Sequence, residues 1–385
     1  MSKMESNRHP KLLLVANVAK EHVLKFHIPT ISMLKDRGWQ VDVACKMDAP
    51  IPCCDHAFNL PVERNPFHFK TVKAIAELQR IIRENNYDIV YCHTVTGSIV
   101  ARLAARPFRK NGVKVIYLAH GFHFYHGAPL KKWIIGYPME RILSEFTDVL
   151  ITINKEDYAF AVKHFNKPKI QRIDGIGVDL SKYQIDFAPE QRELYRKKFG
   201  FFEDDYVGIY VAELTKLKNQ SSLIRATKLI QKSIPEFKLL LVGPDHLNGI
   251  LAEEANGLPT GSIVFTGWRS DVCQLLRSSD IALASSTSEG LGLNIIEAMA
   301  CGLPVVAYDN RGHREIISDQ VNGRLIPLND RSALAKAVIE LRTSSEKVKN
   351  FTQNASESIL RFNTDNVLRE LYEILEFPEY RTMDS

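Results

Sequence analysis

The chain has 385 residues, of which 45% are hydrophobic and 25% are charged, a composition typical of a globular protein with two or three domains. It contains no stretch of about 18 apolar residues, and its first residues lack the apolar centre of a secretory signal. We therefore expect no membrane span, no export and a cytoplasmic location. The six cysteines show no paired zinc spacing, so neither a structural metal nor a disulfide is predicted.

The net charge of +5 is divided unevenly along the chain. Residues 1–182 hold 27 Lys and Arg against 17 Asp and Glu, whereas the remainder holds 23 against 28. Between Asp88 and Glu140 there are seven basic residues and no acidic one, which favours anionic partners. Large aromatic and aliphatic side chains lie among these basic residues: Phe122, Phe124, Tyr125, Trp133, Ile134, Ile135 and Tyr137.

Basic residues interleaved with such side chains are typical of a surface that contacts an anionic bilayer. The alternative is that the aromatic residues belong to the core and the lysines are merely solvated. Nucleic acid is not an expected partner, because the sequence has no helix-turn-helix, RNA-binding signature or zinc pattern.

Short apolar runs alternate with helical patterns along the chain, the latter including residues 27–38 and 69–85. This alternation predicts an α/β fold with two doubly wound, Rossmann-like domains, each built on a parallel sheet. The predicted strands are residues 11–17, 40–45, 88–93, 114–120 and 148–154 in the first domain, and 206–214, 238–244, 262–268, 280–286 and 304–309 in the second.

The expected domain boundaries follow from this order. Residues 1–182 form an N-terminal domain, and residues 183–362 form a C-terminal domain after a polar stretch. Residues 363–385 are expected to form a C-terminal helix that can return to the first domain, followed by a disordered tail. In open α/β sheets, ligands bind beyond the carboxyl ends of the strands. The candidate positions are therefore Asn17, His93, His120, Glu213, Gly243, Gly267, Ser286 and the loop that holds Glu289.

That loop is the most informative segment of the chain. It precedes a predicted helix over residues 293–300, with Glu289 in the loop and Glu297 about two turns inside the helix. Gly290 and Gly292 let the backbone approach a ligand, and a helix N-terminus favours an anion such as a diphosphate. The carboxylates could accept hydrogen bonds from sugar hydroxyls. In the alternative, Glu289 caps the helix and Glu297 is solvated.

Six separated segments of the chain carry a resemblance to a known family: KFHIPTISMLKDRGWQV, YLAHGFHFYHGAPLKKW, VAELTKLKNQSSLIRA, KLLLVGP, VFTGWRSDV and SEGLGLNIIEAMACGLPVVAYDNRGHREII. Together they resemble the nucleotide-sugar glycosyltransferases of family four, and within them the EpsD-type enzymes of bacterial exopolysaccharide synthesis. The resemblance implies the GT-B arrangement, in which two Rossmann-like domains face each other across a cleft, the rear one holding the activated sugar and the front one the acceptor.

The resemblance also assigns roles to single residues. It implies that Glu289 contacts the transferred sugar, that Lys218 binds the diphosphate and that His120 reaches the sugar from the front domain. A lysine there would stabilise the charge that the leaving nucleoside diphosphate gains. The implied substrate-binding residues are Glu297 for the ribose, the backbones of Gly290, Leu291 and Gly292 for the diphosphate and sugar, Trp268 and Arg269 for the base, and Ala19 and Lys20 near the phosphate.

Three features bear on the diphosphate. Glu213 stands where the family often has an arginine, and Ala19 and Lys20 stand where the broader family has a double glycine. No Asp-x-Asp signature is present, so we expect no metal and no cofactor at the site. His120, His123 and His126 have the spacing HxxHxxH, but on an irregular loop this spacing does not predict a zinc site.

The sequence therefore predicts a metal-independent hexosyltransferase or N-acetylhexosaminyltransferase. It would move a sugar from a UDP-sugar to a hydroxyl of a lipid-linked saccharide in bacterial exopolysaccharide or capsule synthesis, and the family resemblance implies that the anomeric configuration is retained. The protein would be peripheral on the inner face of the plasma membrane. The alternatives are a UDP-sugar 2-epimerase and a non-catalytic subunit that binds nucleotide.

Overall fold

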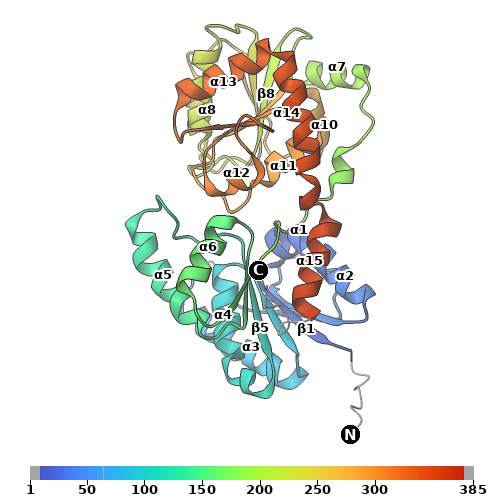
Figure 1. The fold of residues 1–385 in the computed structure, drawn as a ribbon, viewed down its shortest axis with the longest axis vertical. Coiled ribbons are helices and arrows are strands. Elements are labelled where there is room, and N and C mark those ends of the chain that lie inside the picture. The colour runs from blue at the N-terminus through green and yellow to red at the C-terminus, as the bar shows by residue number, and fades with distance from the viewer. Residues whose placement is uncertain (1–8, 64, 377–385) are drawn as a thin grey trace. The chain divides into compact units, whose positions relative to one another are not determined.

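The computed structural model of the chain describes residues 9–63 and 65–376 (Figure 1). Two compact units make up the chain. The first unit runs to Gly177 and includes the segment from Thr364 onward, whereas the second is Val178–Asn363. Within the described ranges, none of the helices combines the length and hydrophobicity needed to cross a bilayer.

The first unit is built on a seven-stranded sheet with the order β3-β2-β1-β4-β5-β6-β7, in which every pairing is parallel. Its inner strands are buried on both faces, which explains their continuous apolar runs. The strands are β1 (Lys11–Val18), β2 (Gln40–Lys46), β3 (Ala57–Asn59), β4 (Ile89–Cys92), β5 (Lys114–Ala119), β6 (Val149–Thr152) and β7 (Lys169–Arg172).

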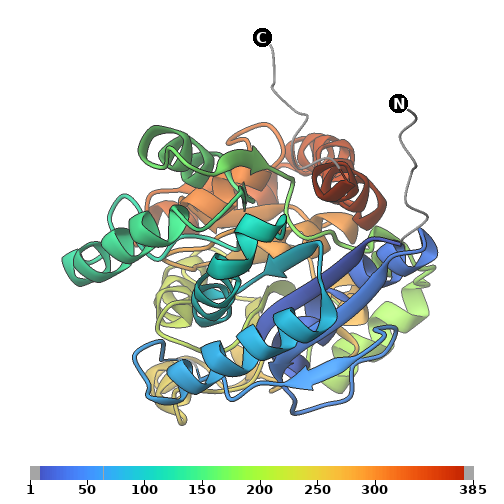
Figure 2. The same ribbon diagram turned by 90° about the horizontal axis from the view of Figure 1, so that it is seen from below.

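Helices cover both faces of this sheet, with α2 and α15 packed together on one face and α3 and α4 on the other (Figures 1 and 2). In α3, residues 71, 74, 78, 81 and 82 are buried, a helical spacing that places one apolar stripe against the core. The helices are η1 (Ala19–Val23), α1 (Leu24–Phe26), α2 (Ile28–Asp36), α3 (Lys70–Asn85), α4 (Val95–Ala105), η2 (Arg106–Asn111), α5 (Leu130–Ser144), α6 (Lys155–His164) and α15 (Thr364–Glu376).

The second unit has a six-stranded parallel sheet with the order β10-β9-β8-β11-β12-β13. The strands are β8 (Tyr206–Val211), β9 (Phe237–Val242), β10 (Ile263–Phe265), β11 (Ile281–Ala284), β12 (Val305–Tyr308) and β13 (Arg324–Ile326). The helices are η3 (Leu180–Tyr183), α7 (Pro189–Lys198), α8 (Gln220–Ile230), α9 (Ile250–Ala255), α10 (Val272–Ser278), α11 (Leu293–Ala300), α12 (Arg311–Ile316), α13 (Arg331–Thr343), α14 (Ser345–Ser358) and η4 (Leu360–Phe362).

The predicted α/β class with two doubly wound sheets is confirmed. Three further strands, β3, β7 and β13, lie at sheet edges and were not predicted. Each has only three or four residues, and most of these are partly exposed, so none has the apolar run that marks a central strand.

The change from the first unit to the second falls between Gly177 and Val178, not after Lys182. Val178 already belongs to the second unit, because its amide donates to the Phe362 carbonyl. The chain returns to the first unit at α15, where the Tyr372 ring packs edge-on against Trp39. The predicted disordered tail falls on residues 377–385, which are outside the described residues.

The basic, aromatic segment of the first unit has two kinds of side chain. Phe122 and Phe124 are buried in the core, and Trp133 and Tyr137 pack against it. Leu130, Ile134 and Ile135 on α5 are instead exposed. The core interpretation therefore holds for these aromatic rings but not for the aliphatic side chains of α5. Among the seven basic residues, Arg102 forms an ion pair with Glu140 and Arg109 forms one with Asp148.

Candidate active site

In the second unit, the loop between β11 and α11 is fixed against the segment that precedes α8. The Thr287 amide donates to the Leu217 carbonyl at 2.9 Å, and the Ser285 hydroxyl donates to the Lys218 carbonyl at 2.8 Å. These bonds cross from the carboxyl end of one strand to the segment that follows its neighbour β8. They place Lys218 beside Glu289, although the two residues are far apart in sequence.

The Lys218 ammonium and the Glu289 carboxylate form an ion pair, with Nζ 2.6 Å from Oε1. The same carboxylate oxygen accepts a hydrogen bond from the Ser286 hydroxyl, which is also 2.7 Å from the Tyr210 hydroxyl. Glu289 does not cap α11, because the N-cap is Gly292 and it has no side-chain hydrogen bond. The bonded carboxylate is thus held beside the N-terminus of α11, where the helix dipole favours anions.

The Glu289 backbone is packed against the start of α12. A Cβ atom on Gly312 would lie 2.7 Å from the Glu289 Cβ, so only glycine fits at this position. Asn310 caps α12 through its side-chain oxygen, and its side-chain nitrogen donates to the Ser286 carbonyl at 3.0 Å. The Arg311 Nε donates to the Glu289 carbonyl at 3.2 Å. The conformation of the loop therefore depends on α12 as well as on α11.

His313 is buried beside the same loop. Its Nδ1 lies 2.6 Å from the Tyr308 carbonyl, to which it can donate only if it carries the proton. Its Nε2 then has the lone pair, and this atom is buried without a partner among the described residues. Burial lowers the pKa of His313, so the imidazole is neutral. Nε2 can accept a hydrogen bond from a ligand hydroxyl.

Glu297 lies on α11, which spans the residues predicted, but it is only the fifth residue of the helix. It is therefore just over one turn from the helix start and not two. The Tyr183 hydroxyl donates to its carboxylate, and burial raises the pKa of Glu297. The carboxylate is thus not simply solvated. Gly302 ends the helix with a positive φ of 79°.

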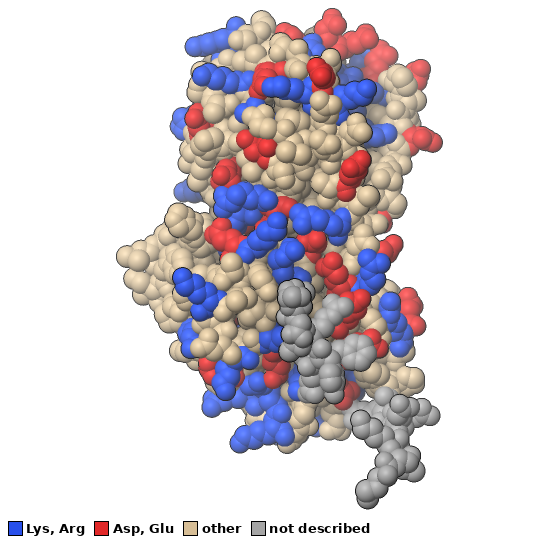
Figure 3. All heavy atoms as spheres, in the orientation of Figure 1, with Lys and Arg blue, Asp and Glu red and all other residues tan. Residues whose placement is uncertain are grey.

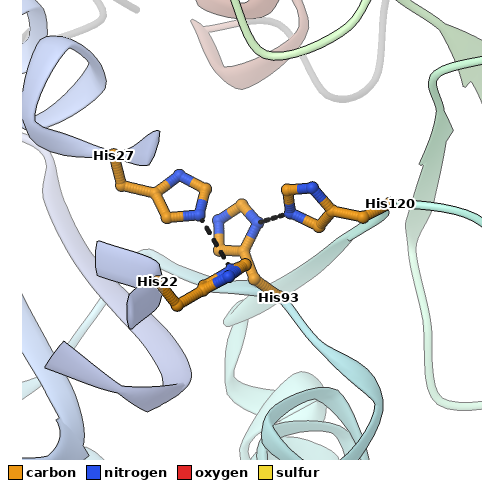
Figure 4. A group of neighbouring side chains, drawn as sticks. All are labelled: His22, His27, His93 and His120. Carbon is orange, nitrogen blue, oxygen red and sulfur yellow. Dashed lines mark hydrogen bonds between the residues drawn. The ribbon is translucent and has the colours of Figure 1, made fainter. Parts of the chain in front are cut away.

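In the first unit, His120 is one of four clustered histidines; the others are His22, His27 and His93 (Figure 4). His93 is a predicted strand-closing residue, but no pattern in the sequence indicates that His22 and His27 lie beside it. His123 and His126, which share the HxxHxxH spacing with His120, do not belong to the cluster.

Comparison with known proteins decides the family. Residues 191–358 match the family described as glycosyl transferases group 1, and residues 11–154 match the one described as glycosyl transferase 4-like. The putative glycosyltransferase EpsD of Bacillus subtilis (strain 168) is 40% identical over 97% of this chain and 98% of its own length. This chain is a group 1 glycosyltransferase.

More distant proteins are similar to this glycosyltransferase over most of its length. The Escherichia coli UDP-Gal:alpha-D-GlcNAc-diphosphoundecaprenol alpha-1,3-galactosyltransferase is 27% identical over 91% of this chain and 92% of its own. The crystal structure of Anabaena HepE with UDP and glucose has a TM-score of 0.78 at 22% identity and covers 96% of this chain and 100% of its own. WaaG has a TM-score of 0.73 at 19% identity and covers 94% and 99%. The fold of this glycosyltransferase is GT-B, with two Rossmann-like domains.

Three other residues that the sequence analysis singled out, Trp268, Arg269 and Glu213, are more exposed than Glu289. The Trp268 side chain is 72% exposed and lies in the loop between β10 and α10. The Arg269 guanidinium is paired with Asp271, with Nε 2.8 Å from the carboxylate. Glu213 is exposed, and its carboxylate lies 3.8 Å from the His246 imidazole. Gly290, Leu291 and Gly292 occupy the loop that leads into α11, as the sequence indicates.

Ala19 and Lys20 lie in the first unit of the glycosyltransferase, in η1. Ala19 is fully buried, and the Lys20 side chain is exposed. The Lys20 amide donates to the Asp48 carboxylate at 2.9 Å, so a phosphate could use this amide only by displacing that bond. The exposed Lys20 ammonium is therefore better placed to bind an anion than the Lys20 amide.

Proposed function

We propose that this glycosyltransferase moves a sugar from a UDP-sugar to a hydroxyl of a lipid-linked saccharide, with retention of configuration, in bacterial exopolysaccharide or capsule synthesis. The observation that carries the proposal is the Lys218–Glu289 ion pair at the N-terminus of α11, with Glu297 one turn along the same helix. One ammonium, two carboxylates and a helix N-terminus match the charge pattern of a nucleoside diphosphate flanked by two sugars.

A diphosphate would displace the Glu289 carboxylate from Lys218 and take the ammonium for itself. Glu289, still held by Ser286, would then accept a hydrogen bond from the transferred sugar, and Glu297 would accept bonds from the ribose. In the reaction, the bond from the anomeric carbon to the phosphate oxygen breaks and a bond to the acceptor oxygen forms. The acceptor proton passes to the leaving phosphate oxygen on the same face. Lys218 stabilises the charge on that oxygen, so the step needs no metal at the diphosphate.

The exposed Trp268 ring offers a surface on which the base of the nucleotide can stack. The names of similar proteins also support a UDP donor and a lipid-linked acceptor. The E. coli relative is named for a UDP-galactose donor and a diphosphoundecaprenol acceptor. HepE has been crystallised with UDP and with UDP-glucose.

The proposed contact with an anionic membrane surface rests on α5. Trp133, Tyr137 and Leu143 of this helix face the core, whereas Leu130 and Ile134, one turn apart, are 73% and 64% exposed. A helix that is apolar on both sides has an unpartnered face. Lys131 and Lys132 lie beside it, and the surface over α5 is mostly uncharged (Figure 3). Such a face suits the headgroup layer of an anionic bilayer.

A cavity lined in part by α5 is suited to a lipid-linked acceptor. Its volume is about 350 Å³. Phe67, Phe124 and Ile135 contribute apolar lining, and Lys131 and Lys132 contribute positive charge. A polyprenyl diphosphate has the same combination of an apolar chain and an anionic head.

The deciding experiment incubates the full-length protein with UDP-glucose, UDP-galactose or their N-acetylated amino forms and a membrane extract. We expect one donor to release UDP and to label a lipid-soluble product, with the anomeric configuration of the donor retained. An altered sugar nucleotide formed with donor alone would instead indicate an epimerase. Nucleotide binding without turnover in any mixture would indicate a binding subunit.

A further inference from the structure

The histidine cluster of the first unit lies where the strand order reverses. His93 follows β4 and His120 follows β5, while His22 and His27 lie in the segment after β1. These three strands are neighbours in the order β1-β4-β5, and the chain changes direction across the sheet between β1 and β4. At such a switch point the loops diverge and leave a crevice in which α/β proteins bind ligands.

The rings of His22, His27 and His120 lie around the His93 ring (Figure 4). One ring nitrogen from each histidine lies within 4.8 Å of one from every other. His22 Nε2 and His27 Nε2 are 3.1 Å apart, and His93 Nδ1 and His120 Nε2 are 3.4 Å apart. In a tetrahedral site with metal–nitrogen bonds of about 2.0–2.1 Å, the ligand nitrogens are about 3.4 Å apart. The two measured separations are close to that value.

The local backbone explains how His22 reaches His27. Residues five apart on a regular α-helix point about 140° apart, since each residue turns the helix by about 100°. Here Ala19–Val23 forms a π-helical turn, which is wider and changes this relationship. Short π-helical turns inside helices are frequent at functional sites. Thr94, next to His93, has a φ of 59°, a rare value for a residue other than glycine.

The four imidazoles are in the state that binds metals. Burial lowers the pKa of His22 to about 4 and that of His120 to about 3. The pKa values of His27 and His93 are also well below the ordinary value, because both rings are buried. Neutral imidazoles each have one nitrogen lone pair. Moreover, His93 Nε2 is buried without a hydrogen-bond partner among the described residues, so hydrogen bonds within the cluster do not satisfy it.

We propose that His22, His27, His93 and His120 bind one divalent transition-metal ion of the class to which zinc belongs. Imidazole nitrogens suit zinc, copper, nickel and iron, whereas magnesium and calcium prefer oxygen. Four neutral ligands leave the full charge of the ion at the switch point, where it attracts anionic groups. Ligation through Nε2 would leave Nδ1 of His120 to contact a substrate.

The first test measures metal content. The full-length protein, freed of any histidine tag, is incubated with Zn²⁺ and dialysed, and its zinc is determined by mass spectrometry. We expect about one ion per chain for the unaltered protein. His22→Ala should weaken zinc binding by about 100-fold or more, since even an outer partner of a metal ligand can be worth 10–100-fold. His126→Ala, an exposed histidine outside the cluster, should bind as the unaltered protein does.

The second test uses Co²⁺ as a spectroscopic probe and does not depend on activity. We expect the intense visible absorption of tetrahedral Co²⁺, and its loss in His22→Ala. His22→Cys should restore binding and add a thiolate-to-metal band, which a merely structural role for His22 would not produce. Circular dichroism of each variant checks that it folds. Absence of bound zinc in the unaltered protein, or an unchanged Co²⁺ spectrum in His22→Ala, would overturn the proposal.

Titration with UDP is run on the same samples. UDP binding is proposed to depend on the second unit, so it reports on the glycosyltransferase function separately. A protein that binds UDP but no metal would refute the metal site alone.

Discussion

Lys218 and Glu289 are 71 positions apart in the sequence, yet the Lys218 Nζ lies 2.6 Å from the Glu289 Oε1. Neighbouring strands β8 and β11 bring the two segments together, and the hydrogen bonds of Ser285 and Thr287 hold them there. Each side chain thus neutralises the other. Under the proposed function, the ion pair would keep both groups oriented for the diphosphate and the sugar, and the substrate would replace a bond of similar kind.

The first prediction concerns this ion pair. Lys218→Ala and Glu289→Ala should each lower the rate of UDP release from the cognate donor and acceptor by about two orders of magnitude, the usual scale for one electrostatic contact. Because the two groups are paired, the double variant should lose less than the product of the single losses. A coupled assay for UDP measures all three. Lys216→Ala, an exposed neighbouring lysine, is the matched control. Near-normal turnover in both single variants would remove these residues from the site.

The second prediction concerns Gly312. In Gly312→Ala the new methyl group would meet the Glu289 side chain and backbone at less than 3 Å, so the loop must shift. We expect UDP release to fall by at least about tenfold, since small misplacements of reacting groups are costly. Gly200→Ala is the control, because it strains a positive φ but meets no atom within 4 Å. It should lower the melting temperature and leave kcat unchanged. Equal effects of both substitutions on kcat would contradict a role for the loop position.

The third prediction concerns Glu297 and pH. Burial raises the pKa of Glu297 in the folded protein, so the protonated form is favoured by folding. This contribution to stability is present below the unfolded pKa of about 4.5 and is lost as the pH rises through the higher folded pKa. Glu297→Gln cannot ionise. Its free energy of unfolding, relative to the unaltered protein, should therefore increase from pH 4 to pH 7.

The same variant should bind UDP more weakly at pH 7, because the carboxylate is the proposed acceptor for the ribose hydroxyls. Chemical denaturation and UDP titration at a series of pH values measure the two effects. If Glu297→Gln were less stable than the unaltered protein by the same amount at every pH, folding would not disfavour the ionised carboxylate, and the prediction would be wrong.

The fourth prediction concerns the exposed face of α5. Ile134→Asp should lower binding to vesicles that contain anionic lipid by about tenfold or more, because one buried aliphatic side chain contributes about 1.5–3 kcal/mol. Added salt should weaken binding of the unaltered protein by screening Lys131 and Lys132. Sedimentation with vesicles measures both. Leu194→Asp is the control, since Leu194 is similarly exposed but lies on α7 in the other unit. Equal loss in both variants would contradict a specific membrane face.

The amino-acid sequence was sufficient to predict the class of fold and the family. Buried parallel strands such as β1 and β8 are unbroken apolar runs, and a run of this kind can be recognised without tertiary information. It also located α11 at residues 293–300, because the buried residues of that helix recur at helical spacing. The edge strands β3, β7 and β13 were not predicted. A strand at the edge of a sheet is partly exposed and does not need a continuous apolar run.

Which distant side chains contact one another became clear from the three-dimensional structure. Glu289 pairs with Lys218, and His22 and His27 meet His93 and His120, because neighbouring strands end side by side and a π-helical turn redirects the chain after β1. For the segment around α5 the sequence left two interpretations open, a membrane-contacting surface or part of the core, and the structure separates the exposed Ile134 from Trp133, which packs against the core. Sequence periodicity records whether a position is apolar, whereas contacts between elements depend on strand order and on the exact path of the loops.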